Sequence, residues 1–458
     1  MRFRFKEFKL TEASNSFAPA ANATPAFPST VSAGSRFASR ASLQLACVIL
    51  GYIGVYLCRK NFSVAVPLLQ TAFNTDKAHI GAIESYATIA YVVGKLFWGP
   101  NLVDRFGGRL CFFIVLLGVA LFGGLSALAI SLPMLGVCYL ANRFFGAGGW
   151  ASMVKLVADW FSTRHLARAL AFLSTSIVFG GVGSLLLTGQ IATATGNNWH
   201  AVLGLPSLIL LLIIGVCWLV LTPGKNNLSE PSAPSRRWSY RVLFELLGIP
   251  QFWMLCCLAF TLTITRETFN FWTVDFFKTE GGAQMTMQHA AWLSIPFDAM
   301  GAIGILALGW LLDRVTHRQR KWLLFSILIC VALATYALPA LAHGSLWPVV
   351  VDMGLIGLLS YGPYCLPAGL FALEMRGKEC VASVAGLVDA AGYLAGIISG
   401  YVFGRILDHG GYQLGFHCLA ITTVVGALLC LGLNRPLKSS PAATQSNVVA
   451  SGWPFISR

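Results

Sequence analysis

The sequence predicts an all-α membrane protein with twelve transmembrane helices in two pseudo-symmetric six-helix bundles. Of the 458 residues, 56% are hydrophobic and only 11% are charged, whereas soluble domains carry roughly 25% charged residues. Apolar stretches of about 20 residues, the length that crosses a bilayer, recur with short polar gaps. One longer polar stretch, residues 223–250, divides these stretches six and six.

The predicted spans follow the apolar stretches in chain order. They cover residues 43–71, 80–101, 109–131, 133–158, 166–191, 201–222, 252–278, 289–312, 321–342, 347–373, 381–407 and 412–434.

The polar segments complete the domain plan. Residues 1–42 are expected to form a disordered cytoplasmic tail, because 13–42 is rich in Ser, Ala and Arg and lacks acidic residues. The remaining predicted units are a first bundle over 43–222, a cytoplasmic linker over 223–250, a second bundle over 251–434 and a cytoplasmic tail over 435–458.

Basic residues orient the chain in the membrane. The formal net charge is +14, with 32 Lys and Arg against 18 Asp and Glu. Most of these basic residues fall in the two tails and the loops on one side, whereas the other side carries only Lys77 and Lys278. The positive-inside rule therefore predicts that both termini are cytoplasmic. The charge reflects topology and contact with membrane lipids, so nucleic acid is not an expected partner.

The sequence offers no sign of an enzyme. Twelve cysteines are scattered without the spacing of a metal site or a disulfide framework. No nucleophile triad, phosphate loop or metal cluster stands out. We expect no catalytic residues, no metal and no cofactor.

Two arginines lie in the middle of apolar spans and need an explanation. A guanidinium at mid-bilayer costs about 2.5–3.5 kcal/mol on insertion scales, so it usually faces a wet cavity or a partner. Arg59 and Arg266 are 207 positions apart, and the Asp-Arg pairs that begin at Asp104 and Asp313 are 209 apart. Nearly equal offsets indicate an internal duplication, with a binding site between the two halves near the midplane.

Polar stripes accompany these arginines. Residues at i, i+4, i+7 and i+11, or at i, i+3, i+7 and i+10, share one helix face. Such stripes predict a common water-accessible cavity, although hydrogen bonding between helices remains an alternative for the Ser and Thr members. The stripes comprise Tyr52, Tyr56, Arg59 and Ser63; Glu84, Thr88, Tyr91 and Lys95; and Thr263, Arg266, Asn270 and Thr273.

Acidic residues within spans could balance the arginines. Glu84, Asp298 and Asp389 are candidates for proton or charge relay. Glu267 adjoins Arg266, but neighbours on a helix point about 100° apart. The planar guanidinium of arginine can bind two phosphate oxygens at once, and a carboxylate or sulfonate would fit one guanidinium nearly as well. The charges alone therefore do not identify the anion that binds.

The loop after the second span resembles the Gly-x-x-x-Asp-Arg signature of the major facilitator superfamily. We expect the loop and its second copy to form a latch between the halves on the cytoplasmic side. The candidate latch residues are Gly99, Asp104, Arg105, Arg109, Asp313 and Arg314.

Other motifs are more specific. Tyr56, Arg59, Lys60 and Phe62 match a Tyr-x-x-Arg-Lys-x-Phe pattern, and the segment 360–375 follows a second family-like pattern. From about residue 45 to 434 the chain resembles the organophosphate:phosphate antiporter family, which has the major facilitator fold. The resemblance implies exchange of an organic phosphate for inorganic phosphate by alternating access, in a bacterial inner membrane and as a monomer.

The resemblance also implies a set of substrate-binding residues. Arginines in the first and seventh helices of the family hold the phosphate, and Arg59 and Arg266 occupy these places. The fifth span has Ser174 to Ile177 where glycerol-phosphate members carry a histidine, which leaves sugar phosphates, phosphoglycerates and phosphonates open. The further candidates for substrate binding are Tyr52, Tyr56, Lys60, Lys95, Asn270, Tyr361 and Tyr393.

Two other functions stay open from the sequence. Some family relatives detect external sugar phosphate and signal instead of moving it. A proton-coupled organic anion carrier would use Asp298, Asp389 or Glu84.

Overall fold

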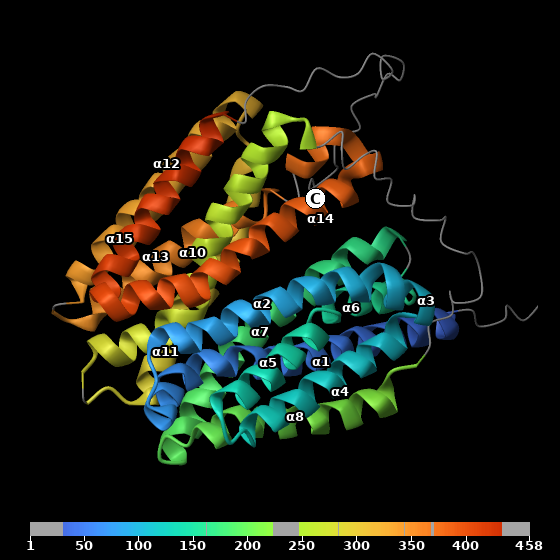
Figure 1. Cartoon of the computed structure of the whole chain (residues 1–458). Helices are drawn as coiled ribbons and strands as arrows, with labels where there is room; N and C mark the ends of the chain where they lie inside the picture. The colour runs from blue at the N-terminus through green and yellow to red at the C-terminus, as the bar shows by residue number, and fades with distance from the viewer. Residues whose placement is uncertain are drawn as a thin grey trace, which may run out of the picture.

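The computed structural model is helical almost throughout the part of the chain that it describes (Figure 1). This part comprises residues 31–161, 163–222, 247–282, 284–342, 344–367 and 371–432. The tail up to residue 30, most of the predicted linker and the tail after 432 lie outside it.

In the described part of the N-terminal half there are eight α-helices and one wider π-helical turn, η1. They are α1 (Val31–Phe73), α2 (Lys77–Phe97), η1 (Trp98–Val103), α3 (Asp104–Phe106), α4 (Gly108–Ala127), α5 (Leu132–Gly146), α6 (Gly149–Ala158), α7 (Thr163–Ala194) and α8 (Trp199–Val220).

The C-terminal half is built from the remaining helices. They are α10 (Pro250–Glu280), α11 (Met287–Leu312), α12 (His317–Leu341), α13 (Leu346–Tyr364), α14 (Ala372–Ile397), the π-helical turn η4 (Ile398–Val402) and α15 (Phe403–Gly432).

These helices correspond in order to the predicted spans. In the described part, nine helical stretches are long and apolar enough to cross a membrane, and one of them, Gly386–Gly432, covers two predicted spans. The spans predicted at 133–158 and 252–278 are absent from that set, because the first is split into α5 and α6 and the second carries a polar stripe. The helices are therefore consistent with twelve crossings.

Three boundaries differ from the prediction. Helix α1 begins at Val31, so residues 31–42 are helical instead of disordered, because their Ala and Arg residues are good helix formers. Helix α5 ends at Gly146, where a Cβ atom on Gly148 would lie 2.6 Å from the Trp98 ring. Gly411, with φ 62°, kinks α15 between the last two predicted spans.

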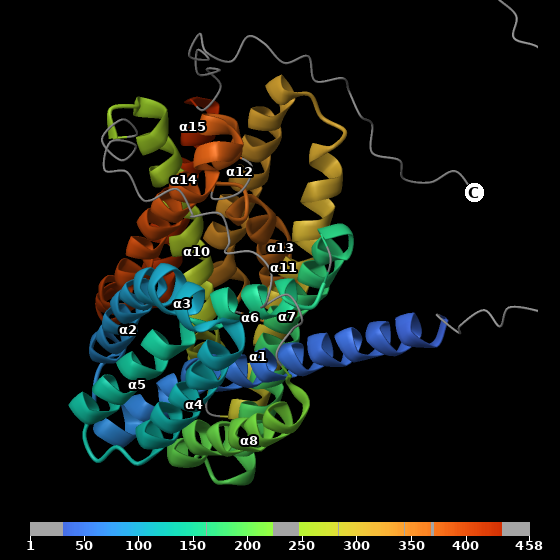
Figure 2. The same cartoon turned by 90° about the vertical axis from the view of Figure 1, so that its right-hand side faces the viewer.

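The helices form two bundles that pack against each other (Figures 1 and 2). Within the first bundle α1 contacts α7 and α8, and within the second α11 contacts α13 and α12 contacts α15. Across the interface α2 meets η4, α14 and α15, while α7 meets α11 and α1 meets α10. The domain boundary itself stays a prediction, because residues 223–246 lie outside the described part.

The two bundles pack tightly against each other at one end of the molecule, where α2 begins. The backbones of Gly81 and Gly400 touch, so a Cβ atom on either glycine would overlap the other's carbonyl group. The Ser85 hydroxyl donates to the Ile397 carbonyl at 2.6 Å and accepts from the Tyr401 amide at 2.8 Å. The Asp408 carboxylate caps α2 by accepting from the first two backbone amides of the helix, at 3.0 and 2.9 Å.

A buried carboxylate completes this closed end. Asp275 of α10 accepts hydrogen bonds from Gln70 Nε2 at 3.1 Å and from Tyr412 Oη at 2.5 Å, and it forms an ion pair with Lys77. Its side chain is only 2% exposed. Because Gln70 and Lys77 belong to the first half, the network must break for the halves to separate here.

Candidate functional site

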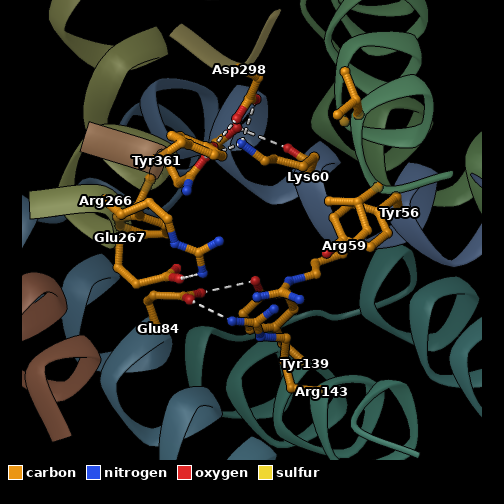
Figure 3. Close-up of a pocket in the computed structure, with 16 residues that line it drawn as sticks. Tyr56, Arg59, Lys60, Glu84, Tyr139, Arg143, Arg266, Glu267, Asp298 and Tyr361 are labelled. Atoms are coloured by element: carbon orange, nitrogen blue, oxygen red, sulfur yellow. Dashed lines mark hydrogen bonds and ion pairs between the residues drawn. The ribbon is translucent and has the colours of Figure 1, made fainter. Parts of the chain in front are cut away.

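A polar cavity lies between the two halves (Figure 3). Side chains from α1, α2, α5 and α7 line it on one side, and side chains from α10, α11 and α13 line it on the other. Its volume is about 60 Å³, which at roughly 10–15 Å³ per water holds a small cluster of waters.

Arg59 enters the cavity without a carboxylate partner. Its guanidinium carbon lies 5.5 Å from the centroid of the Tyr56 ring and 5.0 Å from that of Tyr91. No acidic side chain of the described residues lies within ion-pair distance of it. Cation–π contacts stabilise a guanidinium without neutralising it, so this half-buried group retains a full positive charge.

Arg266 approaches the same space from the opposite half (Figure 3). Its guanidinium carbon lies 4.1 Å from the Tyr364 ring centroid, and its Nη2 forms an ion pair with Glu267. The expectation that Glu267 points away is therefore wrong, because both side chains are long enough to bend toward each other. The buried Nε of Arg266 has no hydrogen-bond partner in the described structure.

Lys60 joins the two halves at the cavity. Its Nζ donates to Asp298 Oδ2 at 2.8 Å and also to Asn270 Oδ1. The Tyr361 hydroxyl donates to Asp298 Oδ1 and lies 3.5 Å from Asn270 Oδ1. Asp298 is thus the counter-ion of a lysine and not of either arginine.

Glu84 belongs to a buried cluster within the first half. Its carboxylate accepts from Arg143 Nη2 and from the Tyr139 hydroxyl, each at 2.9 Å. The Arg143 and Glu84 side chains are only 5% and 8% exposed. Tyr139 and Arg143 are not among the predicted site residues, although their i, i+4 spacing places them on one face of α5.

The cavity carries a positive balance. Its cationic side chains are Arg59, Lys60, Arg143 and Arg266, and its carboxylates are Glu84, Glu267 and Asp298. Among the described lining residues, four positive charges against three negative ones leave a net charge of +1. Since each carboxylate is paired with another cation, the excess charge resides on Arg59.

Four of the candidate residues lie beside the cavity and do not line it. Tyr52 packs edge-on against Tyr56, with ring centroids 5.3 Å apart. Lys95 forms a 2.6 Å ion pair with Asp389 across the two halves, and its Nζ lies 4.2 Å from the Tyr393 ring centroid. This pair is about one-third exposed. The structure brings the other substrate-binding candidates, together with Glu84 and Asp298, into the cavity wall.

The candidate latch residues make no contact between the halves that the described structure shows. Asp104, Arg105, Asp313 and Arg314 are exposed. The guanidinium of Arg314 lies over Trp310 at 3.3 Å, and that of Arg109 lies 5.9 Å from the Trp218 centroid, each within its own half. Among the described residues, the expected latch is not formed in this conformation, because the halves meet at the opposite ends of these helices.

Fold and cavity together define a class of protein. Two helical bundles that enclose a charged cavity at their interface are the architecture of secondary transporters. The chain belongs to the Major Facilitator Superfamily, whose family model matches residues 48–400. It is therefore an integral multi-pass membrane protein, and the expectation that it is not an enzyme agrees with this membership.

Sequence relatives support the narrower resemblance. A probable hexose phosphate transport protein of Chlamydia pneumoniae is 25% identical over 415 residues, covering 84% of this chain and 89% of the relative. The glycerol-3-phosphate transporter of Bacillus subtilis is 24% identical over 414 residues, covering 84% and 90%. The membrane sensor protein UhpC of Escherichia coli is 24% identical over 409 residues, with the same coverage. The resemblance to organophosphate transporters is thus confirmed.

Solved structures confirm the fold. A bacterial homolog of the human lysosomal transporter Spinster, in an inward-facing and unoccupied conformation, superposes with a TM-score of 0.72 at 16% identity. The superposition covers 86% of this chain and 96% of that one. The nucleoside transporter NupG aligns with a TM-score of 0.69 at 15% identity, covering 85% and 98%.

Proposed function

We propose that the protein exchanges an organic phosphate for inorganic phosphate by alternating access, with the phosphate group held between Arg59 and Arg266. The observation that carries the proposal is the uncompensated guanidinium of Arg59 in a cavity of net charge +1. Arginine forks bind phosphate oxygens in bidentate, charge-assisted pairs. The transported compounds named for the relatives, hexose phosphate and glycerol 3-phosphate, carry such a group.

The halves supply the moving parts. With both termini cytoplasmic, the start of α2 lies on the outer side, so the closed end described above faces outward and the carrier is open inward. A phosphate that bridges Arg59 and Arg266 draws the inner ends together. Lys60 and Asp298 already link the halves beside the binding site. Closure of the halves and binding of phosphate are therefore coupled through this ion pair.

Obligatory exchange follows from the charge balance. The empty cavity carries an unpaired positive charge, and burying that charge during reorientation is costly. A bound anion removes this cost. The carrier therefore changes between its inward-facing and outward-facing conformations when an anion is bound, and it does not do so when the cavity is empty.

Counterflow tests the proposal. Purified protein in liposomes loaded with unlabelled phosphate should accumulate labelled external phosphate, and liposomes without internal phosphate should not. Arg266→Lys should abolish the accumulation, whereas Lys278→Arg, at the end of the same helix, should leave it intact. Equal uptake with and without internal phosphate would overturn the exchange mechanism.

A sensor is the second candidate, because the relatives include UhpC. A sensor would bind hexose phosphate at the same arginines without exchanging it. Binding of the compound to the purified protein, combined with absent counterflow, would favour this function.

A further inference from the structure

Glu267 is the carboxylate of the cavity with the fewest partners. Glu84 is held by Arg143 and Tyr139, and Asp298 is held by Lys60 and Tyr361. Among the described residues, Glu267 has one hydrogen-bonding and ion-pair partner, the guanidinium of its chain neighbour. Its side chain also keeps 13% of its surface exposed. Neither packing within one half nor contact between the halves explains this carboxylate.

The proposed phosphate site competes with Glu267 for this partner. Arg266 gives Nη2 to Glu267, and a phosphate that uses the guanidinium fork competes for the same atoms. A carboxylate left unpaired in a desolvated cavity is strongly unfavourable. Glu267 therefore favours a ligand that brings a replacement cation together with its phosphate.

The other cations of the cavity do not provide one. Glu267 interacts electrostatically with Arg59, Arg143 and Lys60. However, Arg143 and Lys60 already hold carboxylates, and Arg59 serves the phosphate. Adding a phosphate dianion to the net charge of +1 leaves −1, and one further positive charge from the ligand restores neutrality.

We propose that the organic substrate carries an ammonium group beside its phosphate or phosphonate, and that this ammonium replaces Arg266 on Glu267. The inference rests on the proposed phosphate site. Because Arg266 and Glu267 are in direct contact, the two charged groups of the ligand must be close neighbours, which a two-carbon spacer allows. The rings of Tyr56 and Tyr361 in the cavity wall offer further faces for a cation.

A matched pair of ligands tests this substrate class. Ethyl phosphate and 2-aminoethyl phosphate share the phosphate and the two-carbon chain and differ in the ammonium group. The purified full-length protein should bind the amino compound about tenfold more tightly, as measured by competition against labelled phosphate and by thermal shift. Glu267→Gln should reduce this ratio to about one, and Glu267→Asp, which keeps the charge, should preserve a preference. Glu280→Gln, at the exposed end of α10, should keep the wild-type ratio.

The outcomes separate the two proposals. Equal binding of both esters by the wild type, or a ratio that Glu267→Gln leaves unchanged, overturns the ammonium site. An equal rise in affinity for both esters in Glu267→Gln would show that Glu267 only competes for Arg266, and this also overturns it. Binding of inorganic phosphate is measured in parallel, and its absence refutes the phosphate site as well.

Discussion

Replacing Arg59 by lysine separates substrate binding from stability. The lysine keeps the positive charge but loses the planar fork, so one of two charge-assisted hydrogen bonds to phosphate is lost. Such a bond contributes about 1.5–3 kcal/mol, which corresponds to a loss of affinity of roughly 10- to 150-fold at 1.4 kcal/mol per factor of ten. Phosphate exchange at substrate concentrations near the wild-type KM should fall to between about one fifth and one hundredth of the wild-type rate.

The same substitution should leave the fold intact. Arg59 has no carboxylate partner in the described structure, and its contacts are the two tyrosine rings at 5.5 and 5.0 Å. Each such contact contributes about 0.5–1 kcal/mol at exposed sites and about 2 kcal/mol when desolvated, and a lysine ammonium retains part of it. The melting temperature of the purified protein should therefore change little.

Arg143→Met provides the opposite control. It removes the partner of Glu84 from a pair that is 5% and 8% exposed, and breaking a buried pair costs about 3–5 kcal/mol. The melting temperature should fall clearly. The assays are thermal unfolding of the purified variants and phosphate counterflow in liposomes. If Arg59→Lys exchanges phosphate normally, or destabilises the protein as much as Arg143→Met, the assignment of Arg59 is wrong.

Three further substitutions probe the interface. Gly400→Val places a branched side chain against the Gly81 carbonyl. The variant should insert into the membrane, but it should not close at the start of α2 and should show no counterflow. Normal exchange would show that this contact is dispensable. Asp298→Asn removes the counter-ion of Lys60 and should weaken phosphate exchange about tenfold in a concentration series; an unchanged KM would contradict the role of the pair. Asp275→Asn removes the carboxylate that pairs with Lys77, so it should lower the melting temperature measured without added phosphate. An unchanged melting temperature would mean that this network does not hold the closed end together.

The fold was predictable because span length and hydropathy are local properties. The twelve apolar stretches and the offset between Arg59 and Arg266 depend only on order along the chain, and the helices follow that order. Helix breaks were not predictable in the same way. The split between α5 and α6 depends on how closely Gly148 approaches Trp98, which is a contact between distant segments.

The sequence predicted part of the cavity lining but not which charged side chains pair with each other. The helical stripes correctly bring Arg59, Glu84, Arg266 and Asn270 to one cavity. The partner that each charge selects depends on side-chain reach across helices, so Glu267 was expected to point away from Arg266. Tyr139 and Arg143 were missed because their partner, Glu84, lies on another helix.

Coupled exchange of the two phosphates tests the central claim most directly. Liposomes that contain the purified protein and labelled inorganic phosphate are diluted into buffer with or without an organic phosphate. We predict that the label leaves only when the organic phosphate is outside, and that the compound enters as the label leaves. Efflux without an external phosphate compound, or uptake driven by a pH gradient into liposomes without internal phosphate, would contradict the exchange mechanism.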